Sequence, residues 1–255
     1  LLAAWSRLMP NIPNHLAIIM DGNRRWARAR RLETLLGHDR GAETLKTIAQ
    51  NSVDAHINWL TVFAFSAENW TRPDYEVQGL MRLIIRFIET QAEELLEANV
   101  RLRIIGRRDR FSNDLCVAMN DLEQRSSTNT GLNLTVALDY GGRQDISSAV
   151  TRIAEELESG MLTAAEINDD LLKSRMQTKI LPPVDLLIRT GGEQRVSNFL
   201  LWDLSYAELF FSAKLWPDFT TTDLFDALAS FERRQRRFGG GRYDDKQPLH
   251  AVVSD

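Results

Sequence analysis

A short polar segment, Asp21-Gly22-Asn23-Arg24-Arg25-Trp26, follows an apolar run directly and holds residues that could bind an anion. A glycine lets the backbone approach a ligand closely, and a guanidinium group such as that of Arg25 can bind two phosphate oxygens at once. The segment therefore predicts a diphosphate cradle without a Walker motif. A turn followed by a solvated basic helix is the alternative, because Arg28, Arg30 and Arg31 continue the run of positive charge.

A second polar segment, Ser66-Ala67-Glu68-Asn69-Trp70-Thr71-Arg72-Pro73, comes after another apolar run. Ser66 and Asn69 can donate or accept hydrogen bonds, while Arg72 can bind an anion. Trp70 can form an apolar wall beside these polar groups. A helix-entry loop capped by its own side chains would have the same composition, so a binding role and a capping role both stay open.

A third segment, Arg189-Thr190-Gly191-Gly192-Glu193-Gln194-Arg195-Val196-Ser197-Asn198, places a glycine turn between two arginines and a serine, which predicts a second anion pocket. Downstream, Glu208 is a carboxylate in an apolar, aromatic strand, where it needs a cation or a metal as its partner. Mg²⁺ binds a few carboxylates together with phosphate oxygens and water, so Asp21 and Glu208 would suffice for it. Two such pockets and two carboxylates are what a reaction between two diphosphate esters requires.

Six short apolar runs would position these segments, and stretches of helical periodicity separate most of them. The runs are His15–Met20, Trp59–Phe65, Val100–Gly106, Leu132–Tyr140, Val184–Thr190 and Ala207–Ser212. This alternation predicts an α/β fold. Most runs are continuously apolar, which is typical of a largely parallel sheet of about six strands with helices on both faces. Because ligands bind at the carboxyl ends of such strands, the first two segments should converge on one edge.

The clearest predicted helix runs from about Tyr75 to Asn99. Its apolar residues recur at spacings of three and four on one face, as in an amphipathic helix. These residues are Val77, Leu80, Met81, Ile84, Ile85 and Ile88. The face could be ordinary core or the lining of an apolar channel, and periodicity alone does not distinguish the two.

The composition favours one globular domain, since 44% of the 255 residues are hydrophobic and 26% are charged. A net charge of -4 argues against a nucleic-acid partner. The sequence contains no Gly-x-x-x-x-Gly-Lys-Ser/Thr loop, which argues against a nucleotide phosphotransferase. The single cysteine, Cys116, lies in an apolar pattern and predicts a core residue in a reducing compartment. No apolar run approaches the roughly 20 residues of a spanning helix.

Taken in order, these segments resemble the signatures of the cis-prenyltransferase family, and within it those of bacterial undecaprenyl diphosphate synthases. The resemblance spans Pro13 to Phe238 and includes Gly37-His38, Arg101–Gly106 and Asp139–Gly142. It predicts one catalytic domain over 13–238, and the glycine-rich, then polar composition of 239–255 predicts a mobile tail. The family implies an α/β homodimer with an apolar product tunnel.

The resemblance implies a transferase that condenses isopentenyl diphosphate in Z configuration onto farnesyl diphosphate, with Mg²⁺ as cofactor. The expected product is undecaprenyl diphosphate, the precursor of the lipid carrier for cell-wall glycans. We expect a cytoplasmic enzyme in transient contact with the inner face of the plasma membrane. A trans-type synthase is disfavoured, because Asp169-Asp170 is followed by Leu171-Leu172-Lys173 rather than by a third aspartate at the required spacing. A non-catalytic subunit of a mixed dimer is a further alternative, against which the retained Asp21 and Arg195 argue.

Carried over residue by residue, the resemblance implies a role for each polar segment. Asp21 and Asn69 are the expected catalytic residues, and Asp21 and Glu208 are the expected Mg²⁺ ligands. Within the substrate-binding set, Arg189, Arg195 and Ser197 would hold isopentenyl diphosphate. The expected substrate-binding residues are Gly22, Asn23, Arg24, Arg25, Trp26, His38, Ser66, Ala67, Glu68, Trp70, Arg72, Arg189, Arg195, Val196 and Ser197.

Several positions depart from the family pattern. Arg24 stands where relatives often have a smaller residue, and Thr34 stands where a basic residue is usual. Phosphate contacts are therefore expected to be redistributed, with Arg30 or Arg31 as candidates to supply the charge that Thr34 lacks. Gln194 replaces a common histidine, which bears on the metal environment near Glu193.

Overall fold

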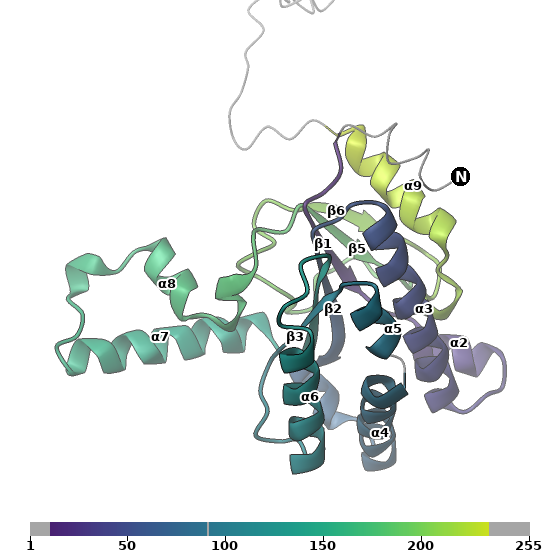
Figure 1. Ribbon diagram of the computed structural model, residues 1–255, viewed down its shortest axis with the longest axis horizontal. Coiled ribbons are helices and arrows are strands. Elements are labelled where there is room, and N and C mark those ends of the chain that lie inside the picture. The colour runs from purple at the N-terminus through teal and green to yellow at the C-terminus, as the bar shows by residue number, and fades with distance from the viewer. Residues whose placement is uncertain (1–10, 91, 235–255) are drawn as a thin grey trace, which may run out of the picture.

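Six parallel strands form the central sheet of the computed structural model, which describes residues 11–90 and 92–234 (Figure 1). The strands follow the order β3-β4-β2-β1-β5-β6, and every neighbouring pair is parallel. The six predicted strands are all present, with ends that differ by one or two residues. Their bounds are β1 His15–Ile19, β2 Trp59–Ser66, β3 Arg101–Ile105, β4 Asn133–Tyr140, β5 Leu186–Arg189 and β6 Glu208–Phe211.

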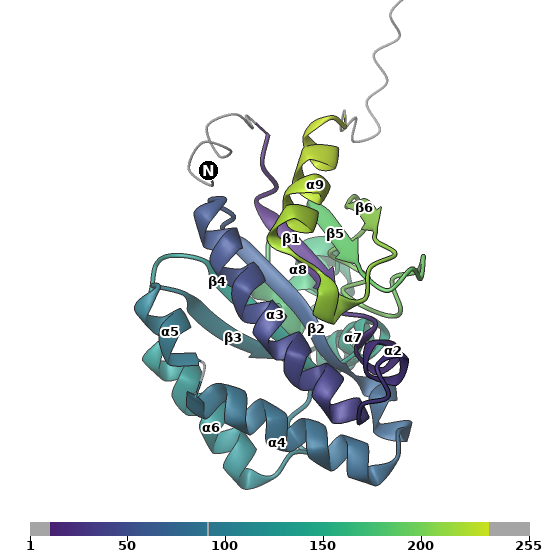
Figure 2. The ribbon, with the colours of Figure 1, turned by 90° about the vertical axis from the view of Figure 1, so that its right-hand side faces the viewer.

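Helices cover both faces of this sheet. The helices α3 and α9 lie over one face, whereas α7 and α8 lie on the opposite side, where α7 projects away from the body (Figure 1, Figure 2). The predicted helix from Tyr75 to Asn99 corresponds to α4 and α5, which flank position 91, a residue outside the described range. The helices are α2 Asn23–Ala29, α3 Thr34–Asp54, α4 Asp74–Thr90, α5 Ala92–Glu97, α6 Asn113–Arg125, α7 Gly142–Glu158, α8 Asp169–Arg175 and α9 Thr221–Glu232, with the 3₁₀ turns η1 Ala67–Thr71, η2 Ala164–Glu166, η3 Gln177–Ile180 and η4 Trp216–Asp218.

The buried strand β1 shows why its sequence is continuously apolar. Leu16 and Ile18 belong to the core cluster that also includes residues of α3 and α9. Ala17 and Ile19 point to the other face and belong to a second cluster. Successive side chains of a strand alternate between faces, so a strand covered on both faces needs an apolar residue at every position. Packing on both sides fixes the carboxyl end of β1, from which Asp21 follows.

Two glycines allow the chain to fold tightly after β1. Gly22 has φ of 116°, and a Cβ atom there would lie 2.9 Å from the Cα of Leu215. A Cβ atom on Gly37 of α3 would lie 2.2 Å from the carbonyl oxygen of Asn23. At Gly22 only glycine avoids both the backbone strain and the close contact, and at Gly37 only glycine avoids the close contact. The junction brings α2 and the start of α3, including His38, to the carboxyl edge of the sheet.

No helix within residues 11–90 and 92–234 is long and apolar enough to cross a membrane. The predicted mobile tail over 239–255 lies outside the described residues, as do the last positions of the predicted catalytic domain, 235–238.

Candidate active site

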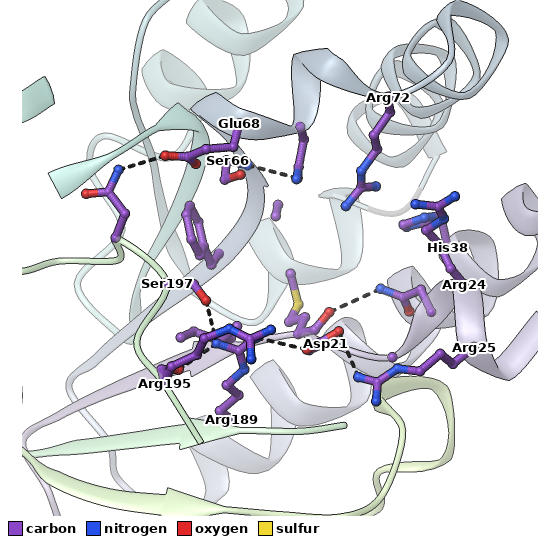
Figure 3. A pocket seen from close by; sticks show the side chains of 18 of the residues that line it. Asp21, Arg24, Arg25, His38, Ser66, Glu68, Arg72, Arg189, Arg195 and Ser197 are labelled. Carbon is purple, nitrogen blue, oxygen red and sulfur yellow. Dashed lines mark hydrogen bonds and ion pairs between the residues drawn. The ribbon is translucent and has the colours of Figure 1, made fainter. Parts of the chain in front are cut away.

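One pocket of about 750 Å³ lies at the carboxyl ends of β1, β2 and β5 (Figure 3). The parallel register explains why distant segments meet there, since Ile19 of β1 is paired with Phe63 of β2 and with Arg189 of β5. All three predicted polar segments contribute to its wall. The expected site residues that the structure brings together are Asp21, Gly22, Asn23, Arg24, Arg25, His38, Ser66, Glu68, Asn69, Arg72, Arg189, Arg195 and Ser197.

The Asp21 carboxylate lies between two guanidinium groups (Figure 3). Its Oδ1 is 3.2 Å from Nη2 of Arg25, and its Oδ2 accepts a hydrogen bond from Nη2 of Arg189 at 3.0 Å. Arg25 also donates to the carbonyl oxygen of Gly191 at 2.6 Å. Each guanidinium carries five N–H donors, so both keep donors for a bound anion. The arrangement can hold a diphosphate next to a carboxylate.

The loop after β5 fixes the second of these arginines. Arg189 is buried, and its Nη1 donates to the carbonyl oxygen of Arg195 at 2.5 Å and to Oγ of Ser197 at 2.7 Å. Ser197 and Asn198 have φ values of 48° and 62°, in the left-handed region that non-glycine residues rarely adopt. Strained backbone persists where surrounding contacts impose it. Here the strained residue Ser197 contacts Arg189 through its hydroxyl.

A second basic group surrounds Glu76, a residue that the sequence did not identify. The Glu76 side chain is fully buried. Its Oε1 is 3.2 Å from Nη1 of Arg72, 3.5 Å from Nε of Arg24 and 3.9 Å from Nε2 of His38. These three basic side chains come from different elements and line the pocket together (Figure 3). Glu76 is therefore the anion that holds this part of the wall in place.

The buried imidazole of His38 is neutral at physiological pH. Burial, and after it the positive charges of Arg72 and Arg24, lower the pKa of His38 to about 3. Its Nε2 has no hydrogen-bond partner among the described residues. A neutral imidazole can still donate or accept a hydrogen bond, so His38 can contact a ligand as a polar group but adds no charge.

We predict that acid destabilises the fold from about pH 6.5 downward. Burial also lowers the pKa of His15 to about 4. A folded-state pKa below the unfolded value means that the unfolded chain binds more protons, so stability is complete above pH 6.5 and falls towards pH 3 to 4. Each histidine should cost about 2 kcal/mol between pH 7 and pH 5. Urea unfolding at both pH values would measure the loss, and a His38→Gln variant should lose roughly half as much. If His38→Gln loses as much unfolding free energy between pH 7 and pH 5 as wild type does, His38 does not contribute to the acid destabilisation.

The loop η1 shows the capping role that the sequence left open, whereas its binding role stays a prediction. Asn69 Oδ1 accepts a hydrogen bond from the Ser66 backbone N–H at 3.1 Å, and the two residues form a capping box. Both also line the pocket. Partial burial opposes ionisation of Glu68, but hydrogen bonds, first of them the one from Asn198, outweigh it and hold the pKa of Glu68 below its usual value. Glu68 is therefore an ionised hydrogen-bond acceptor at this edge.

Two predicted aromatic residues lie outside the pocket wall. Trp26 donates from Nε1 to Oδ1 of Asp218 at 2.7 Å on the other side of α2. Trp70 packs against Phe65 and Phe111, with ring centroids 5.3 and 5.9 Å away. Neither indole lines the pocket of this chain, because the rotation of a short helix decides which side chain enters it, and their contact with substrate stays a prediction. Ala67 and Val196 also lie outside the wall, at the start of η1 and against a core cluster.

The structure changes the expected compensation for Thr34. Arg30 stacks over the Trp26 ring with its Cζ 4.3 Å from the centroid, and it is paired with Asp218. It does not line the pocket. Arg24, Arg25 and Arg28 do line it, so they are the basic residues of α2 that face the site.

Glu208 is not brought together with Asp21. It begins β6 in register with Leu186, at the amino end of β5, whereas Asp21 lies at the carboxyl edge of the sheet. Its partner is Arg234, whose Nη1 lies 2.7 Å from Oε2. The sequence predicted that this carboxylate needs a cation or a metal as its partner, and in the structure the partner is an arginine. The predicted metal site shared by Asp21 and Glu208 is thus not formed within one chain.

The remaining residues fit a metal that arrives with its substrate. No group of three or more His, Cys, Asp or Glu side chains that could hold a metal occurs in the part of the chain that the structure describes. Mg²⁺ often binds proteins through one or two carboxylates and takes its other ligands from phosphate oxygens and water. Asp21 keeps 29% of its side chain exposed in a pocket lined by arginines, so it suits that kind of site.

An apolar cavity of about 130 Å³ adjoins the charged pocket, and Met20, Asn23, His38 and Ala64 line both. It lies between α3, α4 and the sheet. Leu80, Ile84 and Ile88 of the predicted apolar stripe line the cavity, and they pack with Val77, Met81 and Ile85 into one core cluster. The stripe is thus core, part of which also lines the cavity, and a product tunnel stays a prediction.

Comparisons with known proteins find relatives over most of the chain. A prenyltransferase family model described as "Putative undecaprenyl diphosphate synthase" matches residues 19–239. The chain is 47% identical over 233 residues to an isoprenyl transferase of Geobacter sulfurreducens. This alignment covers 91% of this chain and 95% of the relative. It is 46% identical over 238 residues to an isoprenyl transferase of Neisseria meningitidis serogroup B. This alignment covers 93% of this chain and 93% of the relative.

Two solved structures share the fold. Lavandulyl diphosphate synthase from Lavandula x intermedia, in complex with dimethylallyl diphosphate, has a TM-score of 0.87 and 39% identity over 89% of this chain and 98% of that chain. A "probable undecaprenyl diphosphate synthase" from Campylobacter jejuni has a TM-score of 0.75 and 32% identity over 90% and 99%. The predicted α/β fold with one parallel sheet is confirmed. The names of the two proteins state different products, so similarity alone does not fix the product here.

Proposed function

Because this chain belongs to the undecaprenyl diphosphate synthase family of prenyltransferases, we propose that it condenses isopentenyl diphosphate in Z configuration onto farnesyl diphosphate. The proposed product is undecaprenyl diphosphate, the precursor of the lipid carrier for cell-wall glycans. The family supports the coarser statement that the substrates are isoprenoid diphosphates.

One observation carries this proposal: two separate basic groups line a single pocket that adjoins an apolar cavity. Arg25 and Arg189 flank Asp21 in one group (Figure 3), and Arg24 and Arg72 flank Glu76 in the other. Two groups of guanidinium donors suit two diphosphates, and the apolar lining of the cavity suits the first part of the hydrocarbon chain of one of them.

In the proposed reaction the double bond of isopentenyl diphosphate attacks C1 of the allylic diphosphate. A carbon–carbon bond forms, the C1–O bond breaks, and diphosphate leaves with the bonding electrons. A proton then leaves C2 of the isopentenyl unit, and its electrons form the new Z double bond. Asn69 and Glu68 lie on the loop that we propose to assist this proton loss. No covalent intermediate with the protein is required.

The residues of this chain would contribute mainly by position and charge. Holding two anions and an apolar chain in line removes much of the entropic barrier to their reaction. Arg25 and the neighbouring arginines place positive charge where the leaving diphosphate develops negative charge. Mg²⁺, held by Asp21 and by substrate oxygens, would neutralise further charge on the departing diphosphate.

We also propose a homodimer that works at the inner face of the plasma membrane. The arm formed by α7 and α8 projects from the body (Figure 1) and carries exposed apolar residues, among them Val150 and Ile167. Exposed apolar surface of this kind is typical of an interface. Transient contact with a membrane follows from the hydrophobic product rather than from a feature of the chain.

The proposed function is tested by incubating the protein with farnesyl diphosphate, labelled isopentenyl diphosphate and MgCl₂, with EDTA as the control. Products are resolved by chain length, and the double-bond geometry is read by NMR. Long Z-prenyl products that disappear with EDTA would support the proposal. A folded protein that yields no product would favour the non-catalytic subunit of a mixed dimer instead.

We predict that filling the apolar cavity shortens the product. Ala42 of α3 lines this cavity of about 130 Å³, and Ala42→Leu adds three carbon atoms to its wall. Less room for the chain should end elongation several isoprene units earlier, which mass spectrometry of the products would detect. Leu83→Met, a volume-conserving change in the same wall, is the matched control and should leave product length unaltered. An unchanged distribution for Ala42→Leu would place the growing chain elsewhere.

A further inference from the structure

Asn198 joins three segments of the chain at the edge of the pocket. Its Nδ2 donates to Oε1 of Glu68 at 2.9 Å and to Oε1 of Gln144 at 3.0 Å. Its Oδ1 accepts a hydrogen bond from the backbone N–H of Arg143 at 2.8 Å. Its backbone carbonyl oxygen accepts one from the backbone N–H of Gly142 at 2.7 Å. Both amide hydrogens are used, one for each acceptor. The loop after β2, the start of α7 and the loop after β5 therefore meet on one side chain.

The neighbouring residue connects this junction to the charged centre. Ser197 precedes Asn198, and its Oγ accepts from Nη1 of Arg189 at 2.7 Å. The same guanidinium donates to Asp21 at 3.0 Å. Because Ser197 and Asn198 both have left-handed backbone conformations, the loop keeps its shape only while contacts hold it. The contacts of Asn198 are those nearest to this strained segment.

We infer that Asn198 is a positioning residue that couples Glu68, through the loop after β5, to the Arg189–Asp21 pair and so sets the affinity of that pair for diphosphate. The inference rests on the proposed function only for the identity of the natural substrate. The required residue type follows from the geometry. Asparagine supplies two donors and an acceptor, and it tolerates a positive φ better than most other residues.

Asn198→Asp isolates the donor, since aspartate has the same shape and also tolerates the left-handed conformation. It would place a carboxylate oxygen against Oε1 of Glu68, and two carboxylates in contact share a proton with a raised pKa. We expect the dissociation constant for inorganic pyrophosphate to rise about tenfold at pH 8 and only about threefold at pH 6, where the pair can hold a proton. Comparing the variant with wild type at each pH cancels the titration of pyrophosphate itself.

A second background makes the test specific. In Glu68→Gln, the amide of residue 68 can donate to an aspartate at 198, so Asn198→Asp should there cost less than about threefold at either pH. Asn58→Asp, a change in an exposed amide pair at the amino edge of the sheet, is the matched control and should leave pyrophosphate affinity unaltered. Circular dichroism checks that each variant is folded.

Isothermal titration calorimetry with pyrophosphate decides the inference independently of turnover. A loss in the wild-type background that shrinks at pH 6 and in Glu68→Gln would support it. An equal loss in both backgrounds, or no loss in either, would overturn it. If wild type binds pyrophosphate but makes no prenyl product, the proposed function fails while the coupling can still hold. If wild type does not bind pyrophosphate, both fail.

Discussion

Replacing Asp21 with asparagine is expected to lower kcat/KM for chain elongation by about a thousandfold. The carboxylate bridges Arg25 and Arg189, and it is the acid in the pocket that best suits Mg²⁺. Asparagine keeps the shape but removes the charge that orients two guanidinium groups and would bind the metal. Steady-state kinetics with labelled isopentenyl diphosphate at several Mg²⁺ concentrations would measure the effect. We expect the loss to persist at saturating Mg²⁺.

The control for this change is Glu43→Gln, which neutralises an acid in an exposed ion pair with Arg40. Surface pairs contribute little to stability, so this variant should keep the wild-type rate. Asp21→Asn should unfold at a lower urea concentration than wild type, because the buried Arg189 loses its carboxylate partner, so circular dichroism must show that the variant is folded in the assay. A folded Asp21→Asn variant with more than a tenth of the wild-type rate would show that this carboxylate is not essential.

The fold was predictable because each strand carries its own signal. A parallel strand that is buried on both faces must be apolar throughout, and Leu16-Ala17-Ile18-Ile19 shows this in four residues. The same logic located the site, since polar residues directly after such a strand must lie at its carboxyl edge. Asp21 follows β1, and Arg189 ends the neighbouring strand β5. The register between these strands places the two residues side by side.

Side-chain direction was not predictable in the same way. Arg25 and Trp26 are consecutive in the sequence, yet α2 turns Arg25 into the pocket and Trp26 towards Asp218. A segment of seven residues gives too little periodicity to fix its rotation. The ion pair of Glu208 was not predictable for another reason. Its partner Arg234 lies in a remote part of the sequence, so no local pattern could distinguish an ion pair from a metal ligand.

The roles of Asn198 and Glu76 were not predicted from the sequence, although Asn198 ends the third polar segment. Asn198 acts through hydrogen bonds to segments more than fifty positions away in sequence, which only the folded chain brings together. The sequence does contain one indication of the role of Glu76. It precedes Leu80 by four residues and follows Arg72 by four, so it belongs on the buried face of α4 and beside that arginine. A carboxylate on an apolar face is rarely accidental, because burying a charge without a partner is costly.

Glu76→Gln is expected to lower the free energy of unfolding by about 3 kcal/mol, since it leaves Arg72 and Arg24 without their shared anion. The same change should strengthen the binding of inorganic pyrophosphate about fivefold, because a bound anion can then neutralise both guanidinium groups. Added pyrophosphate should therefore stabilise this variant by about 1 kcal/mol more than it stabilises wild type. Urea unfolding with and without saturating pyrophosphate would measure both effects.

These two effects separate a role in the anion pocket from a role in the core alone. A buried residue that served only packing would lose stability on substitution, but pyrophosphate would then stabilise variant and wild type equally. Turnover should still fall, because tighter ground-state binding without the orientation that Glu76 imposes on Arg72 and Arg24 does not help the reaction. Equal stabilisation by pyrophosphate would remove the second basic group from the proposed binding of two diphosphates. A larger stabilisation of the variant would place a diphosphate between Arg24 and Arg72 and leave the Asp21 group free for the other.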